Sequence, residues 1–278
     1  MNKLIIPAQF NQIHLEDFAF DEVSALLVSA KEHALQRGDQ MQMKDIWISE
    51  QILRIHQRFR KAFYYLVNAA YYKAWCELEC TERLLKHLKN HFIYDKKSYR
   101  LWHIEKSIYQ FQIIYPYRTF VAADVIKAKR RCSICEKEIS IHNLCAHEEG
   151  EIYNGEICKR ISQHKEVIKV GMTDHPDQKF NVVFFRDDEK IDSLDLYDYR
   201  IVGEFITQIK SPYQEWDLIV EEKIRRPEDY AHLSKNDACK CGSGRTYLHC
   251  CSTKIGERYA KYHCEIVKDK NAQKKSKF

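Results

Sequence analysis

The grouping of the cysteines constrains the fold more than any other feature of this 278-residue chain. Cys132 and Cys135 form a Cys-x2-Cys turn, and Cys145, His147 and Cys158 follow within a short stretch. Structural zinc takes four thiolate or imidazole ligands, and a Cys-x2-Cys turn supplies two of them from one tight loop. Ordinary buried thiols are the alternative, but this density favours metal. We expect Cys145 and His147 to complete the site, with Cys158 as an alternative ligand or a packing residue.

The composition places these cysteines in a reducing compartment. Hydrophobic residues make up 45% of the chain, which allows a substantial core, and 11 cysteines are present. A disulfide framework is disfavoured, because no apolar signal segment opens the chain and the cysteines pair at metal-ligand spacings. No run approaches the length of a membrane span. We therefore expect a cytoplasmic protein without a transmembrane segment.

The basic character is concentrated at the C-terminal end. Residues 221–278 contain 14 Lys and Arg and 8 Asp and Glu, a net charge of 14 − 8 = +6, against +5 for the whole chain. Such a segment fits contact with an acidic protein surface, acidic lipid or nucleic acid, and it also fits a tail that is merely soluble.

The first part of the chain has a helical pattern. We predict a helix over 15–37 that stops at Gly38, one long helix or two over 49–92, and another over 99–114 that ends before Pro116. A stripe of apolar residues repeats at helical spacing along the second of these: Ile52, Ile55, Phe59, Ala62, Leu66 and Ala69. The stripe predicts the core of an antiparallel helical hairpin or bundle, or a seam for a homo-oligomer.

The pattern changes after the first cysteine group. We predict strands over 166–173 and 180–186 joined by a turn, a helix over 194–210 and a strand over 216–224. These elements predict a compact α+β unit around the first zinc site. The whole chain is therefore expected to be α+β.

Two charged groups in this region have competing interpretations. Four basic residues lie just before Cys132, and they fit either phosphate contacts or the last turn of a helix: Lys127, Lys129, Arg130 and Arg131. Acidic residues are also frequent, and they fit either a nuclease metal cluster or, as we prefer, ordinary turn positions: Asp174, Asp177, Asp187, Asp188 and Asp192.

A second cysteine group occurs near the C-terminus. Cys239 and Cys241 are followed by Gly242-Ser-Gly244, and Cys250 and Cys251 are adjacent. The glycines favour a tight turn that aims backbone amides at thiolates, and the four cysteines can close a tetrahedron. This stretch resembles the SEC-C motif, the zinc-binding tail of the SecA translocation motor and of many other bacterial proteins. Ala238 and Lys240 depart from the motif, in which proline is frequent there, but no ligand is lost.

The resemblance implies a zinc module that docks to a partner protein and contacts membrane surfaces. The chain as a whole is similar to a group of bacterial proteins of uncharacterised function that join a helical front half, a central Cys/His knuckle and a terminal SEC-C motif. We accordingly expect a helical bundle at 1–116, a zinc-knuckle α+β domain at 117–225, and a SEC-C module with a basic tail at 226–278. The module should be detachable, with 226–235 as a linker.

These features favour a zinc-binding protein-interaction protein with two structural zinc ions. Both groups offer four protein ligands, whereas a catalytic zinc keeps one position open. Nucleic-acid binding through the basic tail and the knuckles is the alternative, and a nuclease-type enzyme is a distant one. The chain has no phosphate-binding Gly-x4-Gly-Lys-Ser/Thr, no Gly-x-Ser-x-Gly and no His-Glu-x-x-His, so an enzymatic role has no motif to support it.

Overall fold

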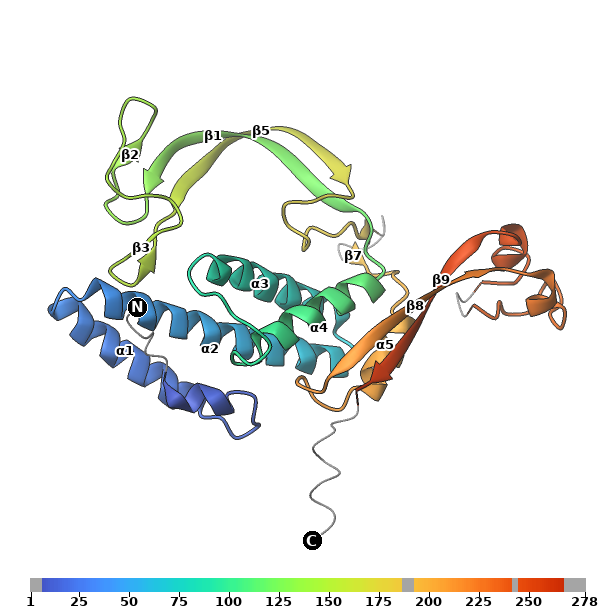
Figure 1. Cartoon of the computed structure of the whole chain (residues 1–278). Helices are drawn as coiled ribbons and strands as arrows, with labels where there is room; N and C mark the ends of the chain where they lie inside the picture. The colour runs from blue at the N-terminus through green and yellow to red at the C-terminus, as the bar shows by residue number, and fades with distance from the viewer. Residues whose placement is uncertain (1–6, 187–192, 242–244, 268–278) are drawn as a thin grey trace, which may run out of the picture. The chain divides into compact units, whose positions relative to one another are not determined.

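The computed structural model describes residues 7–186, 193–241 and 245–267. Within these ranges, five α-helices combine with four small antiparallel sheets, which confirms the expected α+β class (Figure 1). None of the described helices has the length and apolar character needed to cross a lipid bilayer.

The chain divides into two compact units. Unit 1 comprises Met1–Tyr109 and Tyr117–Asp195, and unit 2 comprises Gln110–Pro116 and Leu196–Phe278. This division differs from the three expected segments, because the helix that follows Leu196 and the terminal cysteine motif belong to the same unit.

Unit 1 opens with a helical layer in which α2 packs against both α1 and α3. Its elements are the 3-10 helix Ala8–Gln12 and helices α1 (Phe20–Gln36), α2 (Gln40–Val67), α3 (Tyr71–Lys89) and α4 (Leu101–Ile114), the last of which continues into unit 2. Gly38, at φ +64°, ends the first helix as predicted. Asp39 then caps α2, because its side chain accepts a hydrogen bond from Gln42 N at 3.0 Å.

The long apolar pattern over 49–92 is two helices and not one. The break falls at Ala69, which has a left-handed φ of 55° between α2 and α3. The stripe residues Ile52, Ile55, Phe59, Ala62 and Leu66 are all buried inside unit 1, although Ala69 is exposed. The expectation of a homo-oligomer seam along this stripe is therefore wrong, because the stripe forms the chain's own core.

A long two-stranded ribbon carries the first cysteine group. Strand β1 (Phe120–Cys132) pairs antiparallel with β5 (Arg160–Thr173), and the short strand β2 (Glu138–Ile139) pairs with the end of β1 (Figure 1). Lys127–Arg131 is therefore part of a strand, and the last turn of a helix is excluded there. Strand β5 contains the predicted strand 166–173 and pairs with β1, whereas within 180–186 the strand is β6 (Phe185–Arg186), which pairs with β7 (Ser193–Leu194).

Unit 2 is built on helix α5 (Arg200–Gln208) and a hairpin of β8 (Trp216–Ile224) and β9 (Arg258–Ile266). Trp216 is central to its core, with ring centroids 5.0 Å from Phe111 and 5.8 Å from Phe205. Gln110 fixes the start of β8, since its side chain donates to Trp216 O at 3.1 Å and accepts from Leu218 N at 3.2 Å.

Strand β9 was not expected from the sequence, and it shows that the terminal cysteine motif is not a separate segment at the end of the fold. All nine residues of β9 pair with β8, so the cysteine motif is an insertion between the two strands of one hairpin. The boundary expected at 225/226 thus divides a hairpin. The stretch expected to be a linker begins instead with the 3-10 helix Pro227–Tyr230.

Candidate metal centres

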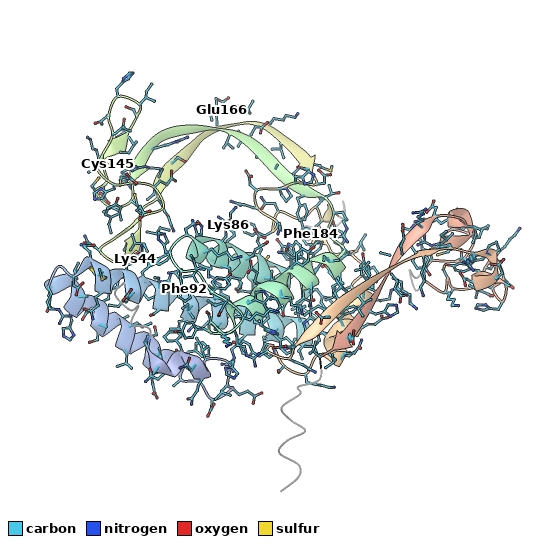
Figure 2. The ribbon with its side chains drawn as sticks, in the orientation of Figure 1. Lys44, Lys86, Phe92, Cys145, Glu166 and Phe184 are labelled. Atoms are coloured by element: carbon cyan, nitrogen blue, oxygen red, sulfur yellow. The ribbon has the colours of Figure 1, made fainter. Side chains whose placement is uncertain are left out.

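The first cysteine group converges at the end of the β1–β5 ribbon. Cys132 is the last residue of β1, and Cys135 lies in the turn that leads to β2. Cys145, which is labelled in Figure 2, and His147 lie in the loop between β2 and β3 (Ile152–Tyr153). One ligand atom from each of these four residues lies within 4.8 Å of all the others. The fold thus gathers the four side chains that the spacing had grouped.

The Cys-x2-Cys turn is shaped by its own backbone. Cys132 N donates to Lys137 O and Glu136 N donates to Cys132 O, both at 3.0 Å. Ile134 N also points at the Cys132 sulfur, at 3.4 Å. Burial acts to raise the pKa of Cys132, but N–H groups of Cys135 and Ile134 that donate to the sulfur hold it at about 6. The turn therefore favours the thiolate, which is the form that binds metal.

His147 is oriented as a ligand would be. Its ring meets that of Tyr153 edge to face, with centroids 4.7 Å apart. Its Nδ1 atom is buried and has no hydrogen-bond partner among the described residues. An unpaired buried nitrogen costs free energy unless something binds it, so this imidazole fits a metal-ligand role.

Cys158 is adjacent to the group without belonging to the set of four. Its sulfur lies 3.7 Å from that of Cys132, and the side chain is buried. Its backbone is held by Glu151 and Gly150, through hydrogen bonds of 2.7 and 2.9 Å. Cys158 is placed to pack beside the thiolates.

Arg160 is a residue at this centre that the sequence pattern did not indicate. Its guanidinium donates to the Cys145 sulfur at 3.3 Å and to His147 O. Burial opposes ionisation of Cys145, but the Arg160 contact lowers the pKa of this thiol overall. The sequence does not mark Arg160 as part of the centre, because an arginine on a strand has many ordinary roles. Only the tertiary fold brings its guanidinium to the Cys145 sulfur.

The second group lies in the insertion between β8 and β9. Ligand atoms of Cys239, Cys241, Cys250 and Cys251 all lie within 4.8 Å of one another. Cys239 N donates to Arg245 O at 2.9 Å, and a bridge between Ala238 and Thr246 closes the loop that carries the first pair. The turn expected at Gly242-Ser-Gly244 lies outside the described residues.

The insertion has only a small apolar core. Tyr230, Cys239 and Cys251 are buried, and Leu233, Tyr247 and Cys250 pack around them. The Tyr230 and Tyr247 rings stack with centroids 5.2 Å apart. A core of this size supplies little folding free energy, so a bound metal would supply much of the rest.

Other candidate groups do not come together. The groups able to hold a metal in the described part of the chain are these two cysteine sets, and no carboxylate cluster is among them. Asp174 is exposed, while Asp187, Asp188 and Asp192 lie outside the described residues. The side chains of Lys127 and Lys129 also lie outside them, whereas Arg130 and Arg131 are exposed.

The first centre offers three thiolates and one imidazole, and the second offers four thiolates. All eleven cysteines are free of disulfide bonds. Comparison of the chain with protein-family models, with curated proteins and with solved structures gives no match.

Proposed function

We propose that this chain binds two structural zinc ions and acts as a cytoplasmic protein-interaction protein. The observation that carries the proposal is the convergence of two separate sets of four soft ligands, each within 4.8 Å. Sets of thiolate and imidazole ligands suit zinc, and four protein ligands leave no position for a reacting water. The zinc ions therefore stabilise structure.

The compartment follows from the same ligands. Zinc sites of this type need reduced thiols, and a reducing cytoplasm maintains them. All eleven thiols are free, as such a location requires. An iron–sulfur cluster is the main competing occupant of a four-thiolate set.

We assign docking to the insertion between β8 and β9. The resemblance of Cys239–Cys251 to the SEC-C motif supports this, since in SecA that motif implies docking to a partner protein. The insertion also presents apolar side chains at its surface, including Leu248 and Ile255. A small metal-stabilised lobe with exposed apolar residues suits recognition of another protein.

Elemental analysis tests the metal part of the proposal. Protein purified without a metal-affinity tag should contain two zinc ions per chain, and Cys132→Ser and Cys239→Ser should each contain one. A single zinc in the unaltered protein, or iron in its place, would contradict the assignment.

A pull-down from native lysate tests the docking part. The Cys239→Ser/Cys241→Ser variant should lose the partner that the unaltered chain retains. Cys76→Ser/Cys80→Ser is the matched control, because these cysteines lie on α3 and belong to neither metal group. Equal retention by both double variants would place docking elsewhere in the chain.

A further inference from the structure

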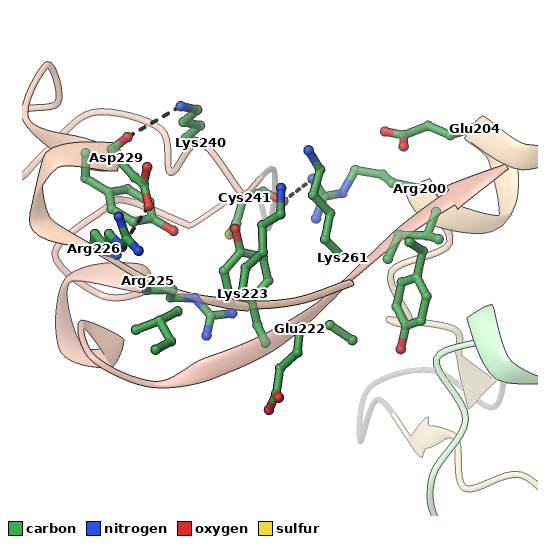
Figure 3. A pocket seen from close by; sticks show the side chains of 16 residues that line it. Arg200, Glu204, Glu222, Lys223, Arg225, Arg226, Asp229, Lys240, Cys241 and Lys261 are labelled. Carbon is green, nitrogen blue, oxygen red and sulfur yellow. Dashed lines mark hydrogen bonds between the residues drawn. The ribbon is translucent and has the colours of Figure 1, made fainter. Parts of the chain in front are cut away.

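A basic groove lies in unit 2 beside the second cysteine group. Its volume is about 960 Å³, and its walls come from α5, from both strands of the β8–β9 hairpin and from the insertion (Figure 3). Six cationic side chains line it: Arg200, Lys223, Arg225, Arg226, Lys240 and Lys261. The acidic residues of the lining are Glu204, Glu222 and Asp229.

In the described part of the chain, four of the six cations have no carboxylate partner, although the Arg225 side chain hydrogen-bonds to Cys251 of the second metal group. Arg200 pairs with Asp198, and Lys223 pairs with Glu221 at 3.0 Å. Of the three acids, Glu222 pairs outside the lining, with Arg258 at 3.4 Å. The groove therefore keeps an excess of positive charge in a concave site, which concentrates anions.

Three cations converge at one end of the groove. The side chains of Lys223, Lys261 and Arg200 point toward one another beside Cys241 (Figure 3). Lys223 and Lys261 lie on the same face of the hairpin, since Lys223 pairs with Tyr259 and Lys261 with Glu221. Arg200 is held there by a hydrogen bond to Cys241 O. Arg200 and Lys223 are each paired with a carboxylate, so Lys261 is the cation of this cluster that is left to bind an anion.

One aromatic ring lies among these cations. Tyr259 is half-buried and lies on the same face of the hairpin as Lys223 and Lys261, whereas Tyr262, which pairs with Val220, lies on the other face. The Arg225 guanidinium lies over the Tyr259 ring, 4.5 Å from its centroid. Cationic side chains that follow a backbone, interleaved with rings on which bases stack, are the features by which proteins hold single strands.

We propose that this groove binds single-stranded nucleic acid, with phosphates against the cations and a base against Tyr259. The inference goes beyond the proposed docking role, and it does not depend on it. A membrane surface fits less well, because the cations line a hollow that a flat bilayer cannot enter. A duplex fits less well because a volume of about 960 Å³ is that of a small-ligand pocket, with room for only a few nucleotides.

Fluorescence anisotropy of the full-length protein with a short labelled oligothymidylate or oligouridylate tests the inference over a series of salt concentrations. The unaltered protein should bind both strands saturably at low salt. The logarithm of its affinity should fall linearly with the logarithm of salt concentration. Arg226→Gln/Lys261→Gln should bind several-fold more weakly, with a slope reduced by about 0.7 for each phosphate that the variant no longer neutralises.

Lys210→Gln/Lys235→Gln is the matched control. It removes the same charge from two exposed lysines of unit 2 that do not line the groove. This pair should leave the slope unchanged. Tyr259→Leu should weaken binding by about tenfold, because a base can no longer stack on the ring, while leaving binding of an abasic strand unchanged. Circular dichroism and zinc content confirm that each variant is folded.

Three results would overturn the inference. The first is the absence of saturable binding by the unaltered protein at low salt. The second is an equal loss of affinity in the groove pair and the control pair, which would show a diffuse charge effect. The third is displacement of the oligonucleotide by polyglutamate when the concentration of its carboxylates equals that of the oligonucleotide's phosphates. This result would assign the groove to acidic peptides.

Discussion

Gln40 and Asn154 exchange two hydrogen bonds, although they are 114 positions apart in the chain. The Gln40 amide donates to Asn154 Oδ1 at 2.7 Å, and the Asn154 backbone N–H donates to Gln40 Oε1 at 3.1 Å. Gln40 is the first residue of α2, and Asn154 lies in the turn between β3 and β4 (Glu156–Ile157). Beside this pair, Lys31 of α1 bonds Glu156 at 2.6 Å. The segment that follows the first metal ligands is thus fastened to the helical layer of unit 1.

The first prediction concerns Gly155, next to this contact. Gly155 has φ +72°, and a Cβ there would lie 2.8 Å from Cε of Lys31. Backbone strain in Gly155→Ala should therefore lower the free energy of unfolding by about 1–2 kcal/mol. The loss should be larger still, because Lys31 must move away from the carboxylates with which it pairs. Gly38→Ala is the control, since Gly38 has φ +64° and nothing within 4 Å of the added Cβ. Denaturant unfolding should show the larger loss for Gly155→Ala, and a Lys31→Ala background should remove the difference.

The second prediction identifies the fourth ligand of the first centre. The ligand set contains His147, whose Nδ1 is buried without a partner among the described residues, while Cys158 packs beside it. His147→Ala should lower the zinc content by about one ion per chain or markedly speed its loss to a chelator. Cys158→Ala should retain two ions. The opposite pattern would make Cys158 the ligand.

The third prediction is a pH dependence caused by His56. Burial lowers the pKa of this imidazole from 6.5 to about 3, despite the opposing hydrogen bond to Tyr99 O, and Arg60, His14 and His103 lower it further. The unfolded chain therefore binds a proton near pH 6.5 that the folded chain excludes until about pH 3. The stability is complete above pH 6.5 and falls as the pH decreases through this window, by up to about 1.4 kcal/mol per pH unit.

His56→Gln should remove this contribution to the slope. Urea unfolding between pH 7 and pH 5 should show a shallower dependence in the variant than in the unaltered protein. His175→Gln serves as the control, because the His175 side chain is 93% exposed and should leave the slope unchanged. Acid-induced loss of zinc affects all three proteins alike, so only the difference between them is interpreted. Equal slopes would contradict the prediction.

The fourth prediction concerns the insertion in unit 2. Arg225 N donates to Glu257 O at 3.0 Å, so these residues continue the β8–β9 pairing beyond Ile224 and Arg258. Replacing residues 226–256 with Asn-Gly should close the hairpin, because a two-residue turn of that sequence joins paired strands. The shortened protein should keep its helix content and one zinc ion, as measured by circular dichroism and elemental analysis.

A chain that ends after Pro227 is the informative comparison. It loses the same metal group but also β9, so β8 is left with an unpaired edge. We expect this truncated chain to unfold at a lower temperature than the shortened one and to aggregate more readily. Equal thermal stability of the two proteins would show that β9 contributes nothing to unit 2.

Local patterns in the sequence were enough to predict the helices and the two cysteine groups. Gly38 and Pro116 mark the ends of helical patterns, and apolar spacing of three and four residues marks their buried faces. The cysteine spacings work in the same way, since each set lies within a short segment whose turns bring the side chains together. These signals depend on neighbouring residues, so they can be read without knowing the fold.

The pairing of distant segments was decided only by the tertiary structure. Strand β5 pairs with β1, which is not its neighbour in sequence, and β9, which the sequence marks only as part of a basic tail, pairs with β8. The reciprocal bonds of Gln40 and Asn154, the Arg160 contact to Cys145 and the basic groove arise in the same way. An alternating pattern indicates which side chains of a strand share a face, but it does not indicate which other strand pairs with that strand. That choice depends on the free energy of the whole packed unit, which no single segment of the sequence contains.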